Sequence, residues 1–283
     1  MKRDKSKKET IKNIVMFSVL TLLLAFLGPI LGGSPSNIGP GFILWGMSPL
    51  LAAIIIRFVT KDWADFRNKP VIRKNIFWYL VSIIAFPIIT VLSFLLGEAL
   101  SISSFSGFIL ADFIKTFLSA LPIFFVFALF EEIGWRGYLV PKLSSLGINS
   151  FASYAMIAVI WATWHLPYFR ELSWVYSSEE LIFFLPRFYL AMFAFAILYG
   201  EICLVSGSVW PAVLMHCVMN AFGHPLSADY IRISPGKDFL VSSTGLFIII
   251  FAGLIGVGIN RYRISREKLL LQADVHIEHN RQV

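Results

Sequence analysis

The chain has 283 residues, of which 57% are hydrophobic and 14% are charged, against about 25% charged in a typical soluble domain. A soluble fold of this size would lack the polar side chains to cover its surface, so the composition excludes a soluble enzyme, a disordered chain and a collagen-like fibre. The formal net charge is +7, and the two cysteines both lie in apolar stretches, which excludes a disulfide-stabilised scaffold.

Long uncharged stretches run through the sequence. Residues 13–56 contain no charged side chain, and about 20 apolar residues are enough to cross the hydrocarbon core as a helix. Turn and charge signals divide the chain into about eight predicted spans, so the predicted fold is all-α, a polytopic bundle of transmembrane helices. In chain order the spans are 13–31, 42–59, 76–97, 108–130, 148–168, 182–202, 208–223 and 239–260. The first resembles a signal peptide but is interpreted as a retained helix, because no small-x-small cleavage site follows it cleanly.

The distribution of Lys and Arg predicts the orientation, because basic residues concentrate in the cytoplasmic loops of membrane proteins. If the N-terminus is inside, the segments 1–12, 57–75, 131–147 and 261–283 hold 19 of the 24 basic residues. We therefore expect both termini to be cytoplasmic and residues 1–283 to form one integral membrane domain in a bacterial cytoplasmic membrane. Topology and attraction to anionic lipid explain the positive charge, so we expect no nucleic-acid partner.

Ionisable side chains in the predicted spans are the candidates for function, because a charge near the bilayer centre is costly unless it is paired or faces a cavity. At the end of the fourth span, Glu132 and Arg136 are four residues apart with the acid first, the favourable order for a helical ion pair. Adjacent helical residues point in different directions, so Glu131 faces another surface. There it could act as a general base, or all three could be interfacial charges that close the helix.

His216 and Asn220 are also four residues apart and share one face of the seventh span. They could bind a metal or donate hydrogen bonds to a developing oxyanion, or each could satisfy a neighbouring polar group. His165, late in the fifth span, could likewise be only a link between helices. Together, two His, an Asn and a Glu are the groups needed to hold and deprotonate a water beside an amide carbonyl, with or without a divalent metal.

Two other polar residues are predicted to be structural. Glu201 is expected to pair with Arg187 or to lie at the membrane interface. His224 is expected in a loop, because Pro225 should stop the helix before it. The sequence lacks the H-E-x-x-H motif of soluble zinc proteases, so any catalytic site has to be assembled from several helices.

Three motifs carry a family resemblance. They are Glu131-Glu132-x-x-x-Arg136 followed by Gly137, Trp161-x-x-x-His165 and His216-x-x-x-Asn220. In order and spacing they resemble the three motifs of the CPBP intramembrane proteases, a family that takes in type II CAAX prenyl endopeptidases and bacterial Abi, bacteriocin-processing and immunity proteins. The resemblance covers about residues 115–223, which we predict to be the catalytic core. One departure is Trp161, where the family often has Phe, so that one aromatic wall replaces another.

The resemblance implies a role for each matching residue. Glu131 would activate the hydrolytic water together with His165. His216 and Asn220 would stabilise the oxyanion of the tetrahedral intermediate. The same four groups are candidates to hold a divalent metal such as zinc, and both a metal-bound and a metal-free mechanism would use them.

Glu132 with Arg136 would hold the geometry of this site. The leading hypothesis is an intramembrane endopeptidase that hydrolyses a peptide or membrane-protein substrate, which enters from the inner face or laterally from lipid. The alternative is a non-enzymatic membrane immunity or scaffold protein that binds a partner such as a bacteriocin. A transporter or channel ranks last, because no paired broken helices recur in two halves of the sequence.

Overall fold

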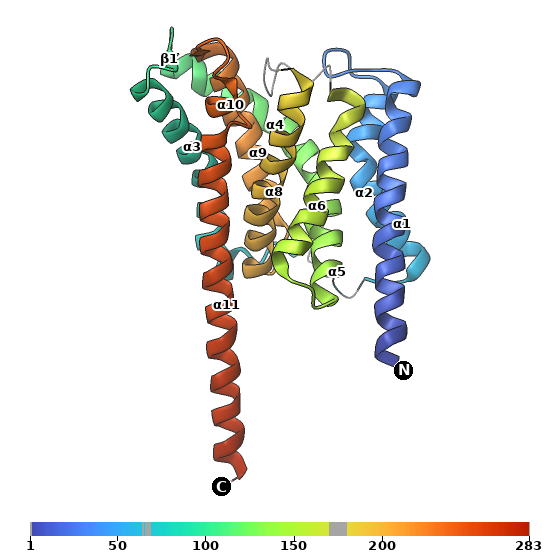
Figure 1. Cartoon of the computed structure of the whole chain (residues 1–283). Coiled ribbons are helices and arrows are strands. Elements are labelled where there is room, and N and C mark those ends of the chain that lie inside the picture. The colour runs from blue at the N-terminus through green and yellow to red at the C-terminus, as the bar shows by residue number, and fades with distance from the viewer. Residues whose placement is uncertain (1, 64, 66–68, 170–179, 283) are drawn as a thin grey trace.

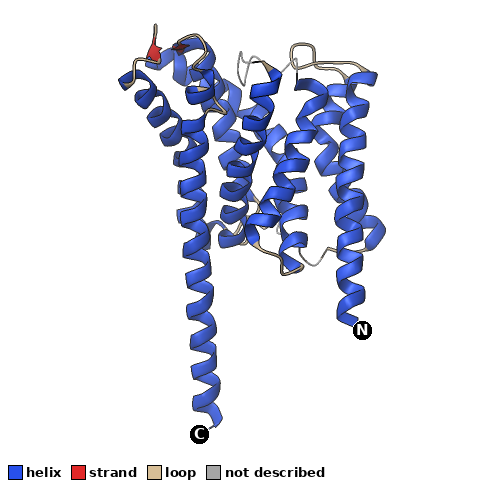
Figure 2. Cartoon of the chain, in the orientation of Figure 1, coloured by secondary structure: helices blue, strands red, loops and turns tan. Residues whose placement is uncertain are grey.

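The computed structural model describes residues 2–63, 65, 69–169 and 180–282, and it is mainly helical (Figure 1). Its elements are α1 (Lys2–Leu31), α2 (Pro40–Thr60), α3 (Ile72–Ala99), β1 (Ser103–Phe105), α4 (Leu110–Gly134), the π-helical turn η1 (Trp135–Leu139), α5 (Val140–Ser145), α6 (Ser150–His165), the 3-10 turn η2 (Leu166–Tyr168), α8 (Leu181–Ser206), α9 (Trp210–Pro225), the π-helical turn η3 (Leu226–Tyr230), β2 (Ile231–Ile233), α10 (Asp238–Val241) and α11 (Leu246–Gln282). The predicted all-α class is confirmed. The two short strands pair antiparallel and join the connections that follow α3 and α9 (Figure 2).

Each predicted span overlaps a helix, but the helices differ in length, and the last span, 239–260, covers α10, the non-helical residues 242–245 and the start of α11. Six helices in the described part of the chain are long and apolar enough to cross a bilayer. The other two predicted spans correspond to α6 and α9, which have 16 residues each. The exact number of crossings therefore stays a prediction. Both ends of the chain lie on the same side of the bundle (Figure 1), and that this side is cytoplasmic also stays a prediction.

Local sequence signals explain several helix ends. Pro40 stands at the start of α2, where its missing N–H would have no helical acceptor. The Asn149 side chain accepts hydrogen bonds from the backbone N–H groups of Phe151 and Ala152, which starts α6. Gly207 adopts a φ of 68° and ends α8. These ends set the positions of the helices that carry the motifs.

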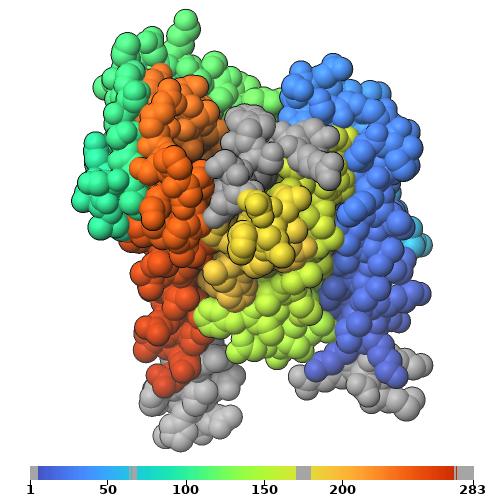
Figure 3. Space-filling view, turned by 45° about the horizontal axis from the view of Figure 1, so that its top comes forward, coloured from blue at the N-terminus to red at the C-terminus, as the bar shows by residue number. Residues whose placement is uncertain are grey.

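The helices pack around a buried interior and expose apolar side chains outward. α9 contacts both α3 and α4, and α8 contacts both α6 and α11. On one face, α6 and α8 separate α1 from α11 (Figure 3). Large apolar side chains such as Leu23, Phe58 and Ile182 are each more than 60% exposed. Such a surface is typical of contact with lipid, and the protein is an integral membrane protein.

His224 does not lie in a loop. It belongs to α9, which reaches Pro225 and continues through η3. A π-helical adjustment accommodates a proline, which has no N–H to donate to the preceding turn. The expectation that Pro225 ends the helix before His224 is therefore wrong.

Candidate active site

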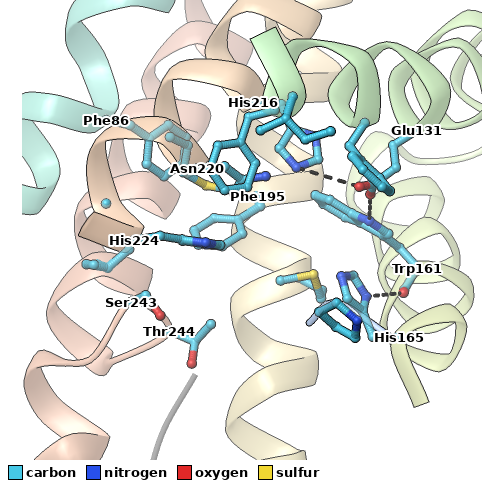
Figure 4. A pocket seen from close by; sticks show the side chains of 18 of the residues that line it. Phe86, Glu131, Trp161, His165, Phe195, His216, Asn220, His224, Ser243 and Thr244 are labelled. Carbon is cyan, nitrogen blue, oxygen red and sulfur yellow. Dashed lines mark hydrogen bonds and ion pairs between the residues drawn. The ribbon is translucent and has the colours of Figure 1, made fainter. Parts of the chain in front are cut away.

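The last turn of α4 carries two glutamates with different surroundings. Glu132 is completely buried, and its Oε1 accepts hydrogen bonds from Arg136 Nη1 and His216 Nδ1, each at 2.9 Å. The ion pair expected between Glu132 and Arg136 is present. Glu131 instead lines a cavity (Figure 4), because adjacent residues of a helix point in different directions.

The Arg136 guanidinium lies between two aromatic rings. Its central carbon is 4.3 Å from the centre of the Trp161 ring and 4.8 Å from that of Tyr199. Nε and Nη2 have no hydrogen-bond partner among the described residues, and the ring faces take the place of water around the cation. This packing fixes Arg136 and, through the ion pair, the carboxylate of Glu132.

The backbone after α4 widens into the π-helical turn η1. The N–H of Val140 donates to the carbonyl oxygen of Trp135, which closes the turn. A π-helical turn contains one residue more than an α-helical turn and is frequent at functional sites. Within it, the carbonyl oxygen of Gly137 accepts a hydrogen bond from Arg57 Nη2 at 2.8 Å. A side chain of α2 therefore supports the turn that follows the two glutamates.

The two oxygens of Glu131 have different neighbours. Trp161 Nε1 donates to Glu131 Oε2 at 2.8 Å. Glu131 Oε1 lies 3.9 Å from His216 Nε2, too far for a direct hydrogen bond. Glu131 and His216 are 6% and 4% exposed, so both groups lie inside the protein.

Hydrogen bonds at Nδ1 orient both histidines. His216 Nδ1 faces the carboxylate of Glu132, and His165 Nδ1 lies 2.8 Å from the carbonyl oxygen of Trp161. An ionised carboxylate and a carbonyl oxygen only accept, so Nδ1 carries a proton in each ring. Nε2 is therefore the ring nitrogen that these hydrogen bonds do not use.

An apolar cavity of about 310 Å³ connects these groups. Glu131, His165, His216 and Asn220 all line it, although they come from α4, α6 and α9 (Figure 4). The structure thus brings the four candidate residues together. Most of the remaining wall is aromatic or aliphatic and includes Phe42, Phe86, Phe127, Met192 and Phe195.

Comparisons with known proteins agree with this assembly. Residues 113–222 match the model of a family described as type II CAAX prenyl endopeptidase Rce1-like, and this range contains all six candidate residues. The resemblance to this family is confirmed. The CAAX prenyl protease 2 of Methanococcus maripaludis is 27% identical over 256 aligned residues, which cover 84% of this chain and 89% of that protein. Similarity to a CAAX protease therefore extends beyond the motifs, while the roles of the individual residues stay predictions.

The cavity of this CAAX protease-like chain extends toward the end of the bundle opposite the chain termini. There it is lined by Pro35 and Ile38, from the connection between α1 and α2, and by Ser243 and Thr244, between α10 and α11 (Figure 1). In the predicted orientation this end is the outer one. The shape of the cavity gives no support to the expected entry of substrates from the inner face.

The donor groups do not form a preformed metal site. In the part of the chain that the structure describes, no three His, Cys, Asp or Glu side chains are grouped so that they could hold an ion. Catalytic zinc sites have three protein ligands as a rule. The residues as arranged do not fit such a group, so the mechanism is derived from the side chains themselves.

Glu201 is completely buried and pairs with Arg263 and not with Arg187, while its depth in the membrane stays a prediction. It also accepts hydrogen bonds from Tyr154 and Asn260, whereas Arg187 donates to the connection between α10 and α11. The expected pairing with Arg187 is wrong, because the partners of Glu201 on α11 are about 60 residues away in the sequence. Its interactions are those of a structural residue.

Sequence reasoning missed three contributions to the site. They are the indole N–H of Trp161, the Tyr199 ring over Arg136, and His224, which also lines the cavity. His224 lies four residues after Asn220, so helical spacing alone could have placed it on the same face. Contacts of the other two depend on how separate helices pack, and no local pattern marks them.

Proposed function

We propose that this protein is an intramembrane endopeptidase, similar to the CAAX prenyl proteases, that hydrolyses a peptide bond in a peptide or membrane-protein substrate. The observation that carries the proposal is the convergence of a carboxylate, two imidazoles and an amide on one cavity within the helical bundle. The family match and the name of the relative support the same reaction class. The apolar walls suit a substrate segment that partitions into lipid.

Glu131 is the general base in this mechanism. Its Oε1 takes a proton from a water that lies between Glu131 and the histidines, and His165 Nε2 orients that water. The resulting hydroxide adds to the carbonyl carbon of the scissile peptide. A positioned general base typically contributes a factor of about 10² to 10⁴ in rate.

The oxyanion that forms is stabilised from α9. The Asn220 amide donates one hydrogen bond, and His216 donates a second from Nε2 when its ring is doubly protonated. Glu132 keeps His216 oriented through the bond at Nδ1. Glu131 then returns its proton to the leaving nitrogen as the carbon–nitrogen bond breaks.

Hydrolysis of a reporter peptide by purified protein in detergent tests this mechanism. In Glu131→Ala and His165→Ala variants we expect turnover to fall by about 10²-fold or more. Glu98→Ala is a matched control, because Glu98 is an exposed carboxylate near the end of α3 and should leave turnover unchanged. Unchanged turnover in a folded Glu131→Ala or His165→Ala variant would contradict the proposal.

A divalent metal such as zinc, for which the sequence makes these four groups candidates, is tested separately, because the described side chains as arranged do not form a site for it. Metal analysis of the purified protein, combined with turnover before and after chelation, distinguishes the two forms of the mechanism. Loss of turnover on chelation and its return on adding zinc would show that the four candidate groups act together with a metal. Turnover that is unaffected in metal-free protein would assign them to water and substrate alone.

A further inference from the structure

Trp161 connects the two groups that activate water in the proposed mechanism. Its indole N–H donates to Glu131 Oε2 at 2.8 Å, and its backbone carbonyl oxygen lies 2.8 Å from His165 Nδ1. Among the described residues, the Trp161 indole is the one group that donates a hydrogen bond to the Glu131 side chain. A single residue of α6 therefore touches both Glu131 and His165.

The indole is itself held firmly. Trp161 is 1% exposed, its ring lies over the Arg136 guanidinium at 4.3 Å, and its centre is 5.8 Å from that of His216 in an edge-on arrangement. A buried ring packed on several sides has few alternative rotamers. The N–H that it presents to Glu131 is consequently fixed in direction.

We propose that Trp161 is a positioning residue for Glu131, an inference that rests on the proposed function. A carboxylate acting as a base needs one oxygen directed at the water, and an unrestrained carboxylate rotates. The bond from Trp161 engages Oε2 and leaves Oε1 on the side of His216 Nε2, 3.9 Å away. Trp161 thereby selects which oxygen receives the proton.

This role depends on the N–H and not on the aromatic ring as such. A phenylalanine in the same place would keep an aromatic face over Arg136 and fill most of the same volume. It would leave Glu131 Oε2 without its donor. Trp161→Phe therefore separates positioning from simple packing.

The experiment measures kcat, KM and thermal unfolding of Trp161→Phe on the reporter peptide. Trp164→Phe is the matched control, because Trp164 is equally buried and does not line the cavity, and its indole donates to Ser48 Oγ at 2.8 Å and to the carbonyl oxygen of Trp45 at 3.2 Å instead of to Glu131. For Trp161→Phe we expect kcat to fall about 10- to 100-fold with KM within about threefold, since a hydrogen bond to a charged group is lost. For Trp164→Phe we expect a lower unfolding temperature with kcat within about threefold of wild type.

Two results would overturn the proposal. One is a Trp161→Phe protein with wild-type kcat while Glu131→Ala is inactive, which would leave Trp161 as a wall only. The other is an equal loss of kcat in both Trp variants, which would make the effect structural. If Glu131→Ala itself keeps turnover, the proposed function fails, and that outcome is distinguishable from both.

A second measurement applies if Trp161→Phe does not fold. In protein labelled with ¹⁵N-tryptophan, the indole resonance of Trp161 should shift in Glu131→Ala, because its acceptor is removed, while the Trp164 resonance stays in place. A Trp161 resonance that does not move would contradict the hydrogen bond and with it the proposal.

Discussion

Glu132 and Glu201 are both completely buried glutamates paired with an arginine, but their surroundings differ. Around Glu201, one oxygen accepts from Tyr154, Asn260 and Arg263 Nη2, and the other from Arg263 Nε at 2.7 Å. Both oxygens of the Glu201 carboxylate therefore accept hydrogen bonds. Three helices, α6, α8 and α11, are joined at this point.

Around Glu132, the bonding is incomplete. Oε1 accepts from both Arg136 and His216, whereas Oε2 has no partner among the described residues. The neighbouring Glu131 lines the cavity. Glu201, with both oxygens bonded, joins three helices, whereas Glu132 is bonded through one oxygen and holds His216, which lines the cavity.

The largest effect on stability is expected from Glu201→Ala. Removing the acid leaves Arg263 and Asn260 without their shared acceptor, and breaking a buried ion pair typically costs about 3–5 kcal/mol of unfolding free energy. Turnover per folded molecule should stay unchanged, because Glu201 does not line the cavity. Unfolding in detergent provides the measurement. Glu267→Ala is the control: it removes the exposed second acid of Arg263 and should cost about 0.5 kcal/mol or less.

In contrast to Glu201→Ala, Asn220→Ala should lower turnover and leave stability nearly unchanged. Asn220 is partly exposed in the cavity, so its loss should hardly change stability. Removing one donor to an oxyanion typically lowers kcat by about 10²-fold or more. The kinetics of the reporter peptide measure this, and an unchanged kcat would remove Asn220 from the proposed oxyanion site.

Replacing arginine by lysine in each cluster is expected to have intermediate effects. Arg263→Lys loses the fork that bonds both oxygens of Glu201, and Arg136→Lys loses the planar cation between two rings, so each should cost about 1–2 kcal/mol of stability. Only Arg136→Lys should also lower kcat, by about tenfold. The reason is that Arg136 holds the Glu132 carboxylate, which in turn orients His216. Equal kcat in the two variants would show that the clusters do not differ in the proposed way.

The smallest effect is expected from His224→Ala. His224 lines the cavity one turn beyond Asn220 and packs edge-on against the ring of Phe124. It would contact substrate away from the scissile bond, so binding in the ground state and the transition state should weaken alike. We expect KM to rise less than about tenfold with kcat unchanged, measured on the same peptide. If kcat fell further in His224→Ala than in Asn220→Ala, His224 would have to contact the reacting groups, which would contradict this expectation.

Sequence reasoning was most successful where the physics is local. The uncharged stretches coincide with helices, because burial in lipid requires continuous apolar length. The pair of Glu132 and Arg136 follows from helical spacing alone. The shared presence of Asn220 and His216 in one cavity wall follows from the same rule.

Interactions between distant segments were not predictable in this way. The bond from Trp161 to Glu131 spans 30 residues, and that from Arg263 to Glu201 spans 62. The expectation for His224 is wrong for a different reason, because a proline normally predicts the end of a helix, whereas the chain after Pro225 continues in a wider turn. Helix packing and nonstandard turns decided these points, and neither leaves a periodic signal in the sequence.

The π-helical turn after α4 makes the number of residues between Glu132 and Lys142 as important as their identity. Lys142 bonds Asp62 and, at 2.9 Å, Asp65, which ties the far side of this turn to the segment after α2. Because the wide turn already takes up one residue more than an α-helical turn, one further residue inserted between Tyr138 and Leu139 would rotate all that follows by about 100°. An insertion that changes no charge and no motif would thus turn Lys142 away from both aspartates while leaving the glutamates in place.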